Sequence, residues 1–268
     1  MKKVAVAVIH GMGHGLYNFA DDFMAEVEKN LDSHLADSVG WIPLYWGDLL
    51  DGRQERYLKR ANAAGRLDWQ ALREFIVYAL GDAVAYRQTA GARQSVYSRV
   101  RNRISTNFHE SWARDFKYTN PPLIWVANSL GTHVMSNYIW DTMRDFPSPL
   151  DGNDFLRQQT IRGVFTTGST LPLFTFACPR IDPIRLPEGA KWYNIYDRDD
   201  ILGWPLKPIN KKYNKAVTED VQINVGGLTT SWNPLCHLNY WSDDEVITRV
   251  ADFIRETLDS PTEEQMNA

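Results

Sequence analysis

Short apolar runs recur along this chain, and each is followed by glycine or polar residues. Runs of this length are typical of strands that a parallel sheet buries on both faces. The first run, Val4–Ile9, leads into a turn rich in glycine and histidine, and another begins at Leu123 after two prolines. Further strands are expected at residues 41–46, 161–167, 192–196 and 221–225.

Between these runs, apolar residues recur at the spacing of amphipathic helices. Helices are expected over residues 16–35 and 130–144, and a terminal helix is expected to start at a capping box formed by Ser242 and Glu245. Strands that alternate with helices in this way predict an α/β fold, with a mostly parallel central sheet flanked by helices.

Residues 48–118 differ from the rest of the chain. They carry helical patterns and almost no strand pattern, and they hold a net charge of +5 against −9 for the remainder. One helical face of this segment is apolar and contains Leu72, Phe75, Ile76, Ala79, Leu80, Ala83 and Val84. We expect a helical cap inserted into a core domain formed by residues 1–47 and 119–268.

Two interpretations of the 48–118 segment remain open on sequence alone. Its apolar face either lines a pocket over a site or packs on the sheet like an ordinary helix. Its arginines, among them Arg99, Arg101 and Arg103, either contact an anionic surface peripherally or form a solvated helix face.

Composition narrows the possible classes of function. A chain of 268 residues with 44% hydrophobic residues is long enough for one large α/β domain, and its formal charge of −4 carries no signature of nucleic-acid binding. Cys178 and Cys236 form neither a metal-binding spacing nor a disulfide framework. We expect no metal or other cofactor, no transmembrane helix, and a cytoplasmic protein, because the apolar run at residues 4–9 is too short for a signal peptide.

A serine lies where a predicted strand turns into a predicted helix. The sequence there is Ala127-Asn128-Ser129-Leu130-Gly131. Such a turn lifts the serine hydroxyl clear of the sheet and needs small residues on both sides, because the backbone is crowded. Ala127 and Gly131 are small, although the usual motif has glycine at the first of these positions. Ser129 is therefore a candidate nucleophile.

The turn after the first strand has the sequence His10-Gly11-Met12-Gly13. Glycines at this place let the backbone approach either a dinucleotide pyrophosphate or an oxyanion. The spacing does not match the dinucleotide fingerprint, which disfavours an NAD-dependent oxidoreductase. We expect the backbone N–H of Met12 to form one half of an oxyanion hole, with His10, Gly11 and Gly13 supporting the loop.

Four motifs, in their order along the chain, resemble the α/β-hydrolase superfamily and are nearest to its lipase and esterase branches. They are His10-Gly11-x-Gly13, Ser129-Leu130-Gly131, Asp200-Ile201-Leu202 and His237-Leu238-x-Tyr240-Trp241. The resemblance implies an α/β-hydrolase fold with Ser129 as nucleophile, His237 as general base and acid, and Asp200 as the orienting carboxylate. It also implies Met12 and Leu130 as oxyanion donors. Asp200 is preferred over Asp199 and Asp197 because two hydrophobic residues follow it.

The resemblance implies a serine hydrolase that cleaves a small-molecule carboxylic ester through an acyl-enzyme. Ten tryptophans favour a substrate with an apolar acyl group. The alternative is a catalytically inactive protein of the same fold that binds a lipid or a protein partner. The sequence leaves open whether the substrate is a short-chain ester, a lipid or a thioester.

Overall fold

The computed structural model describes residues 1–11, 17–50, 52–65, 68, 70–86, 95–144, 153–176, 181–226 and 234–260. Within this part of the chain, six strands form a parallel sheet in the order β2-β1-β3-β4-β5-β6. The strands are β1 (Val4–Ile9), β2 (Val39–Leu44), β3 (Leu123–Asn128), β4 (Ile161–Thr167), β5 (Lys191–Asp197) and β6 (Glu219–Ile223). The α-helices are α1 (Asp21–Lys29), α2 (Ser33–Ala36), α3 (Arg53–Ala64), α4 (Gln70–Ala85), α5 (Val96–Arg114), α6 (Leu130–Arg144), α7 (Leu171–Thr175), α8 (Lys211–Ala216) and α9 (Asp244–Asp259). Short 3₁₀ helices are η1 (Gly47–Leu50), η2 (Lys207–Ile209), η3 (Pro234–Leu238) and η4 (Tyr240–Ser242).

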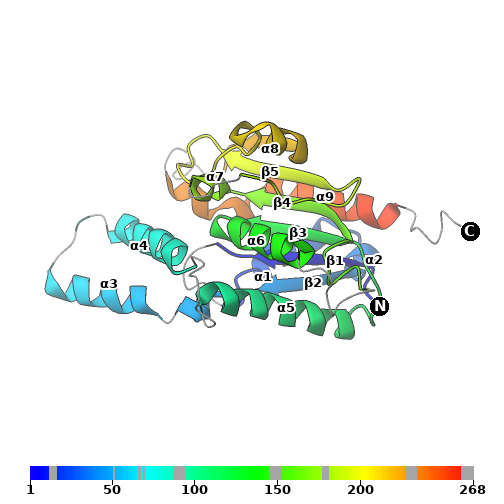
Figure 1. The fold of residues 1–268 in the computed structure, drawn as a ribbon, viewed down its shortest axis with the longest axis horizontal. Helices are drawn as coiled ribbons and strands as arrows, with labels where there is room; N and C mark the ends of the chain where they lie inside the picture. Colours follow the sequence, from blue (N-terminus) through cyan, green and yellow to red (C-terminus); the bar gives the residue numbers. More distant parts are fainter. Residues whose placement is uncertain are drawn as a thin grey trace, which may run out of the picture.

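The parallel strands bring their carboxyl ends together at one edge of the sheet. In Figure 1 the chain enters β1 from the N-terminus at the right, so this edge lies at the left. The segments that follow β1, β3, β5 and β6 carry the residues that the sequence motifs single out. The topology therefore gathers candidate residues that are far apart in the chain.

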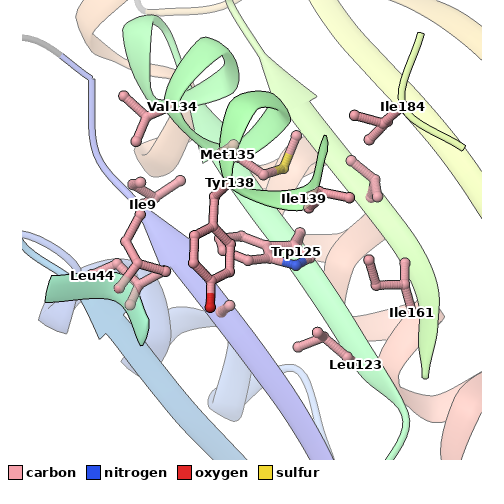
Figure 2. Packing of buried hydrophobic residues seen from close by; sticks show 14 of the residues in the cluster. Ile9, Leu44, Leu123, Trp125, Val134, Met135, Tyr138, Ile139, Ile161 and Ile184 are labelled. Atoms are coloured by element: carbon pink, nitrogen blue, oxygen red, sulfur yellow. The ribbon is translucent and has the colours of Figure 1, made fainter. Parts of the chain in front are cut away.

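The sheet separates two hydrophobic cores. Alternate residues of β1 serve the two sides, with Ala5, Ala7 and Ile9 in one core and Val4, Val6 and Val8 in the other. The first core includes buried residues of α5 and α6, and the second includes those of α1 and α9. Figure 2 shows part of the first core, where Met135 and Ile139 of α6 lie beside Trp125 of β3. Burial on both faces explains why the strand sequences are continuously apolar.

Helix α5 forms part of the layer that covers the sheet. Its residues Val100, Ile104 and Phe108 are fully or almost fully buried, and the Phe108 ring lies 5.4 Å from that of Trp125. Arg101 and Arg103 of the same helix form ion pairs with Asp141 and Asp48. These contacts do not test whether the 48–118 segment meets an anionic surface, which stays a prediction.

Helices α3 and α4 extend away from the sheet on the side where the strands end (Figure 1). Two members of the expected apolar face are exposed, Ile76 by 44% and Val84 by 73%. The side chains of Leu72, Phe75, Ala79 and Leu80 lie outside the described residues. The division into a core domain and a cap stays a prediction. Of the described helices, none has the length and apolar character needed to cross a membrane.

Most elements form where the hydrophobic pattern predicts them. The helix over residues 130–144 and the strand over residues 161–167 have the predicted bounds, whereas β2 and β6 begin two residues earlier than expected. The single helix expected over residues 16–35 is wrong, because the chain forms two shorter helices, α1 and α2, separated by a turn.

The capping box predicted for the last helix is also wrong. Asp243 is the N-cap of α9, and its carboxylate accepts hydrogen bonds from the backbone N–H groups of Glu245 and Val246. The Ser242 hydroxyl instead donates to the carbonyl of Asn239, because Ser242 belongs to the preceding 3₁₀ helix. Serine and aspartate are comparable caps, so the sequence pattern alone does not separate the two positions.

Candidate active site

Ser129 occupies the sharp turn between β3 and α6. Its φ angle is 52°, a left-handed conformation that few non-glycine residues adopt. The backbone N–H of Ser129 donates to the carbonyl of Thr167 at 2.9 Å, and its carbonyl accepts hydrogen bonds from the hydroxyls of Thr132 and Thr170 at 2.7 and 3.3 Å. These bonds hold the serine in a conformation that costs free energy.

Two glycines let the end of β1 approach this turn closely. A Cβ atom at Gly11 would lie 2.6 Å from the Cβ of Ser129, and one at Gly131 would lie 2.5 Å from the carbonyl oxygen of His10. A larger residue at either position would therefore push the strand and the turn apart. The turn forms with Ala127 at its first small position, where the side chain is fully buried.

The turn after β5 and the loop after β6 bring Asp200 and His237 to the serine. His237 Nε2 lies 2.7 Å from Ser129 Oγ, and His237 Nδ1 lies 2.7 Å from Asp200 Oδ2. All three residues are at most 4% exposed. Burial raises the pKa of the Asp200 carboxyl, but hydrogen bonds from His237, Leu202 and Tyr240 outweigh this effect and leave the pKa lowered. An ionised Asp200 places the His237 proton on Nδ1, which leaves Nε2 free to accept from the serine hydroxyl.

The two alternative carboxylates lie elsewhere on the same turn. The Asp197 carboxylate accepts hydrogen bonds from the backbone N–H groups of Asp199 and Val225 at 2.7 and 2.5 Å, so it links the ends of β5 and β6. The Asp199 side chain is 40% exposed and lies 3.9 Å from Arg198. Asp200 is the carboxylate that lies within hydrogen-bond distance of His237 Nδ1.

His10 fixes the start of the predicted oxyanion loop. The backbone N–H of Trp46 donates to His10 Nε2 at 3.0 Å, so the ring proton is on Nδ1, which donates to the Gly11 carbonyl at 3.1 Å. The Trp46 indole N–H also donates to the His10 carbonyl at 3.1 Å. Burial lowers the pKa of His10 to about 3, so the ring is neutral at neutral pH.

Of the two predicted oxyanion donors, Leu130 and Met12, the structure describes Leu130. Leu130 is the first residue of α6, and N–H groups in the first turn of a helix have no intrahelical acceptor. Its N–H can therefore donate to an oxyanion, assisted by the helix dipole. The other predicted donor, Met12, and the supporting Gly13 lie outside the described residues. Within the described residues, no group of His, Cys, Asp and Glu side chains is arranged to hold a metal ion.

Several residues that pack around Ser129, His237 and Asp200 were assigned no role from the sequence. A Cβ at Gly168, whose φ is 52°, would lie 2.6 Å from the Tyr240 ring and 3.1 Å from His237. A Cβ at Gly203 would clash with the Asp200 carboxylate. Tyr240 belongs to the His-Leu-x-Tyr-Trp motif, which is a signal that could have identified it. The glycines carry no comparable local pattern.

A groove of about 920 Å³ begins one helical turn beyond Ser129, between α6, α7 and the segment at residues 181–185. Its apolar lining includes Trp140, Met143, Leu171 and Phe174, and its charged lining consists of Arg144, Asp182 and Arg185. His133 lines the near end and stacks on Phe174 with ring centroids 4.0 Å apart. Burial lowers the pKa of His133 to about 4, as suits a packed histidine and not a second base.

Comparisons with known proteins give fold-level likenesses alone. No protein-family model matches the sequence, and a search of curated proteins finds no significant match. Similar solved structures include a protein assigned to the α/β-hydrolase superfamily from Xanthomonas campestris pv. campestris, at 10% identity and a TM-score of 0.46, covering 95% of this chain and 99% of that one. A dienelactone hydrolase from Anabaena variabilis is 13% identical with a TM-score of 0.41, covering 96% of this chain and 86% of the other. A YdeN-like hydrolase from Pectobacterium atrosepticum is 12% identical with a TM-score of 0.41, covering 95% and 92%.

At these identities and TM-scores, the likenesses identify neither a substrate nor a set of site residues. The fold follows instead from the chain itself. A parallel sheet carries a serine on a left-handed turn after β3, an aspartate after β5 and a histidine after β6. This chain is a protein of the α/β-hydrolase fold.

Proposed function

We propose that this protein is a serine hydrolase that cleaves carboxylic esters through an acyl-enzyme. The observation that carries the proposal is the continuous hydrogen-bonded line from Ser129 Oγ through His237 to Asp200, with both links at 2.7 Å. A nucleophile, a base and a group that orients the base are what acyl transfer to serine requires.

The proposed reaction has two balanced steps. The serine oxygen attacks the ester carbonyl while His237 Nε2 takes the hydroxyl proton, and the imidazolium then gives that proton to the departing alkoxide, which leaves as an alcohol. Water next attacks the acyl-enzyme, with His237 again accepting and returning a proton, and the carboxylic acid is released. The N–H groups of Leu130 and Met12 stabilise the oxyanion in both steps.

We further propose that the acyl group of the substrate is apolar. Exposed apolar side chains directly follow two of the proposed catalytic residues, with Ile201 exposed by 58% and Leu238 by 62%. Phe176, just after α7, is exposed by 81%. Together with the groove along α6, these side chains offer an apolar surface to a chain attached at Ser129.

In this proposal the helical hairpin formed by α3 and α4 acts as a cap near the site. Its exposed apolar side chains, such as Ile76 and Val84, suit contact with an apolar substrate better than contact with water. The basic character of residues 48–118 is the basis for a peripheral contact with an anionic surface.

The test is hydrolysis of p-nitrophenyl esters with acyl chains from acetyl to palmitoyl, assayed with and without lipid vesicles. We expect turnover by the wild type, loss of it in Ser129→Ala, and a preference for chains longer than acetyl. Wild-type protein that binds the esters without turning them over, with binding unchanged in Ser129→Ala, would support the inactive binding protein instead.

A further inference from the structure

Tyr240 lies at the start of the 3₁₀ helix η4, next to Ser129, His237 and Asp200, which we call the triad. Its hydroxyl lies 2.8 Å from Asp200 Oδ2, and the backbone N–H of Asp197 lies 2.9 Å from the same hydroxyl oxygen. The side chain is fully buried, and its ring lies edge-on to that of His237 at a centroid distance of 6.2 Å. The hydroxyl therefore joins the end of β5 to the carboxylate that contacts the histidine.

The direction of these hydrogen bonds is fixed by the donors. An amide N–H can donate and cannot accept, so the Asp197 N–H donates to the Tyr240 oxygen. The single hydroxyl proton of Tyr240 is then left to point at Asp200 Oδ2. Burial and the neighbouring Asp200 charge raise the pKa of Tyr240 well above its usual value, so this proton stays in place at all ordinary pH values.

Asp200 Oδ2 consequently receives two donors, the Tyr240 hydroxyl and His237 Nδ1–H. Its other oxygen, Oδ1, accepts from the Leu202 N–H at 2.9 Å. A carboxylate with three donors is held both in orientation and in its ionised form. The line of donors begins at a backbone amide of the sheet edge, which cannot rotate away.

We propose that Tyr240 is a positioning residue for the triad: its hydroxyl, oriented by the Asp197 N–H, holds the Asp200 carboxylate and sets how strongly that carboxylate attracts the His237 imidazolium. The catalytic part of this role rests on the proposed serine hydrolase function. The effect on the histidine does not, because it follows from the hydrogen bonds alone.

Electrostatics determines whether loss of the Tyr240 hydroxyl strengthens or weakens the attraction between Asp200 and His237. The hydroxyl proton places positive charge beside Asp200 Oδ2 and offsets part of the carboxylate charge that His237 meets. Removing the hydroxyl exposes more negative charge to the imidazolium, so the hydrogen bond from His237 Nδ1–H to Asp200 becomes stronger. Titratable groups near this cluster in the described part of the chain include the carboxylates of Asp197 and Asp199 and the buried Cys236 thiol, whose pKa is raised to about 12 by burial and by these carboxylates. The Tyr240→Phe substitution leaves these three groups in place.

The experiment compares wild type, Tyr240→Phe and a matched control, Tyr97→Phe. Tyr97 of α5 also donates to a carboxylate, that of Asp141 in α6 at 2.6 Å, but it lies outside the candidate site. The Nδ1–H proton resonance of His237 is measured by NMR of histidine-labelled protein at one fixed pH, with the signal assigned by its loss in His237→Asn. The rate of labelling by a fluorophosphonate is measured on the same three proteins.

We expect the His237 Nδ1–H resonance to shift in Tyr240→Phe and to stay at its wild-type position in Tyr97→Phe, because only the first substitution changes the hydrogen bonds of Asp200. Labelling of Tyr240→Phe is expected to slow about tenfold at neutral pH. A His237 Nδ1–H resonance in Tyr240→Phe equal to that of wild type would overturn the proposal. If the wild type itself is not labelled, the hydrolase proposal fails, and the resonance still decides the role of Tyr240.

Discussion

The carboxyl edge of the sheet and the α3–α4 hairpin are built in opposite ways. At the edge, a Cβ atom at Gly11 would overlap Ser129. The side chains of Ser129, Asp200, His237 and Tyr240 are hydrogen-bonded to one another, and Asp200 also accepts from the backbone. In the hairpin, Gly65 has open space around its Cβ position, and the apolar side chain of Val84 faces solvent. Tight packing restricts residue identity at the edge, whereas the exposed positions of the hairpin, such as Val84, are not restricted by packing.

The largest effect is expected at the edge, from replacing the carboxylate that contacts the histidine. Asp200→Asn keeps the size of the side chain but removes the charge that holds the His237 proton on Nδ1, so ester hydrolysis should fall by about 10³–10⁴-fold. Asp199→Asn is the matched control, because its side chain is partly exposed, and it should change the rate by less than about threefold. Equal losses in the two variants would show that Asp200 is not the orienting group.

A second comparison uses one glycine from each region. Gly11→Ala forces the end of β1 away from Ser129 and should reduce ester hydrolysis about 100-fold and the free energy of unfolding by about 2 kcal/mol. Gly65→Ala meets no atom within 4 Å, and its free energy of unfolding should stay within about 0.5 kcal/mol of wild type. Denaturant unfolding measures the free energy of unfolding of both variants, and p-nitrophenyl ester assays measure their rates of hydrolysis. A Gly11→Ala protein as stable and active as wild type would contradict the close packing between Gly11 and the turn at Ser129.

The edge should also be the more acid-sensitive region. The pKa of buried His10 is about 3 when folded and about 6.5 when unfolded, so its contribution to stability is complete above pH 6.5 and is lost as the pH falls toward 3. At pH 4.5 this loss is about 3 kcal/mol. His10→Gln keeps an acceptor for the Trp46 N–H without titrating, so its stability deficit relative to wild type should shrink between pH 7 and pH 4.5. A deficit that is constant with pH would argue against a neutral, buried His10.

The smallest effect on stability is expected in the hairpin. Val84→Ser should change the free energy of unfolding by less than about 0.5 kcal/mol, whereas Val100→Ser in α5 places a hydroxyl in the core and should cost about 2 kcal/mol or more. If the hairpin caps the site, Val84→Ser should raise KM for long-chain esters and leave acetate esters unaffected. A loss of stability equal to that of Val100→Ser would mean that the Val84 side chain is buried in a core.

The same contrast explains what the sequence could predict. The strands were recognisable because burial on both faces demands continuous apolar runs. The turn between β3 and α6 was recognisable because it demands small residues around Ser129. The order of serine, aspartate and histidine indicated the fold. The bond between Ser129 and His237 joins residues 108 positions apart, so its geometry depends on the whole sheet and not on any local pattern.

Other features needed the structure for specific physical reasons. The link from Asp197 through Tyr240 to Asp200 joins the end of β5 and the turn after it to the 3₁₀ helix η4, 40 or more positions along the chain, and no periodicity indicates it. Helical periodicity also predicted an apolar face that included Val84, but it cannot tell whether any neighbour covers that face. The N-cap at Asp243 differed from prediction because two adjacent residues are comparable caps.

Labelling by a fluorophosphonate tests directly whether Ser129 is a nucleophile. We expect wild-type protein to be labelled stoichiometrically, the adduct to map to the peptide that contains Ser129, and Ser129→Ala to remain unlabelled. Labelling of Ser129→Ala at the wild-type rate, or no labelling of folded wild-type protein, would show that Ser129 is not the nucleophile.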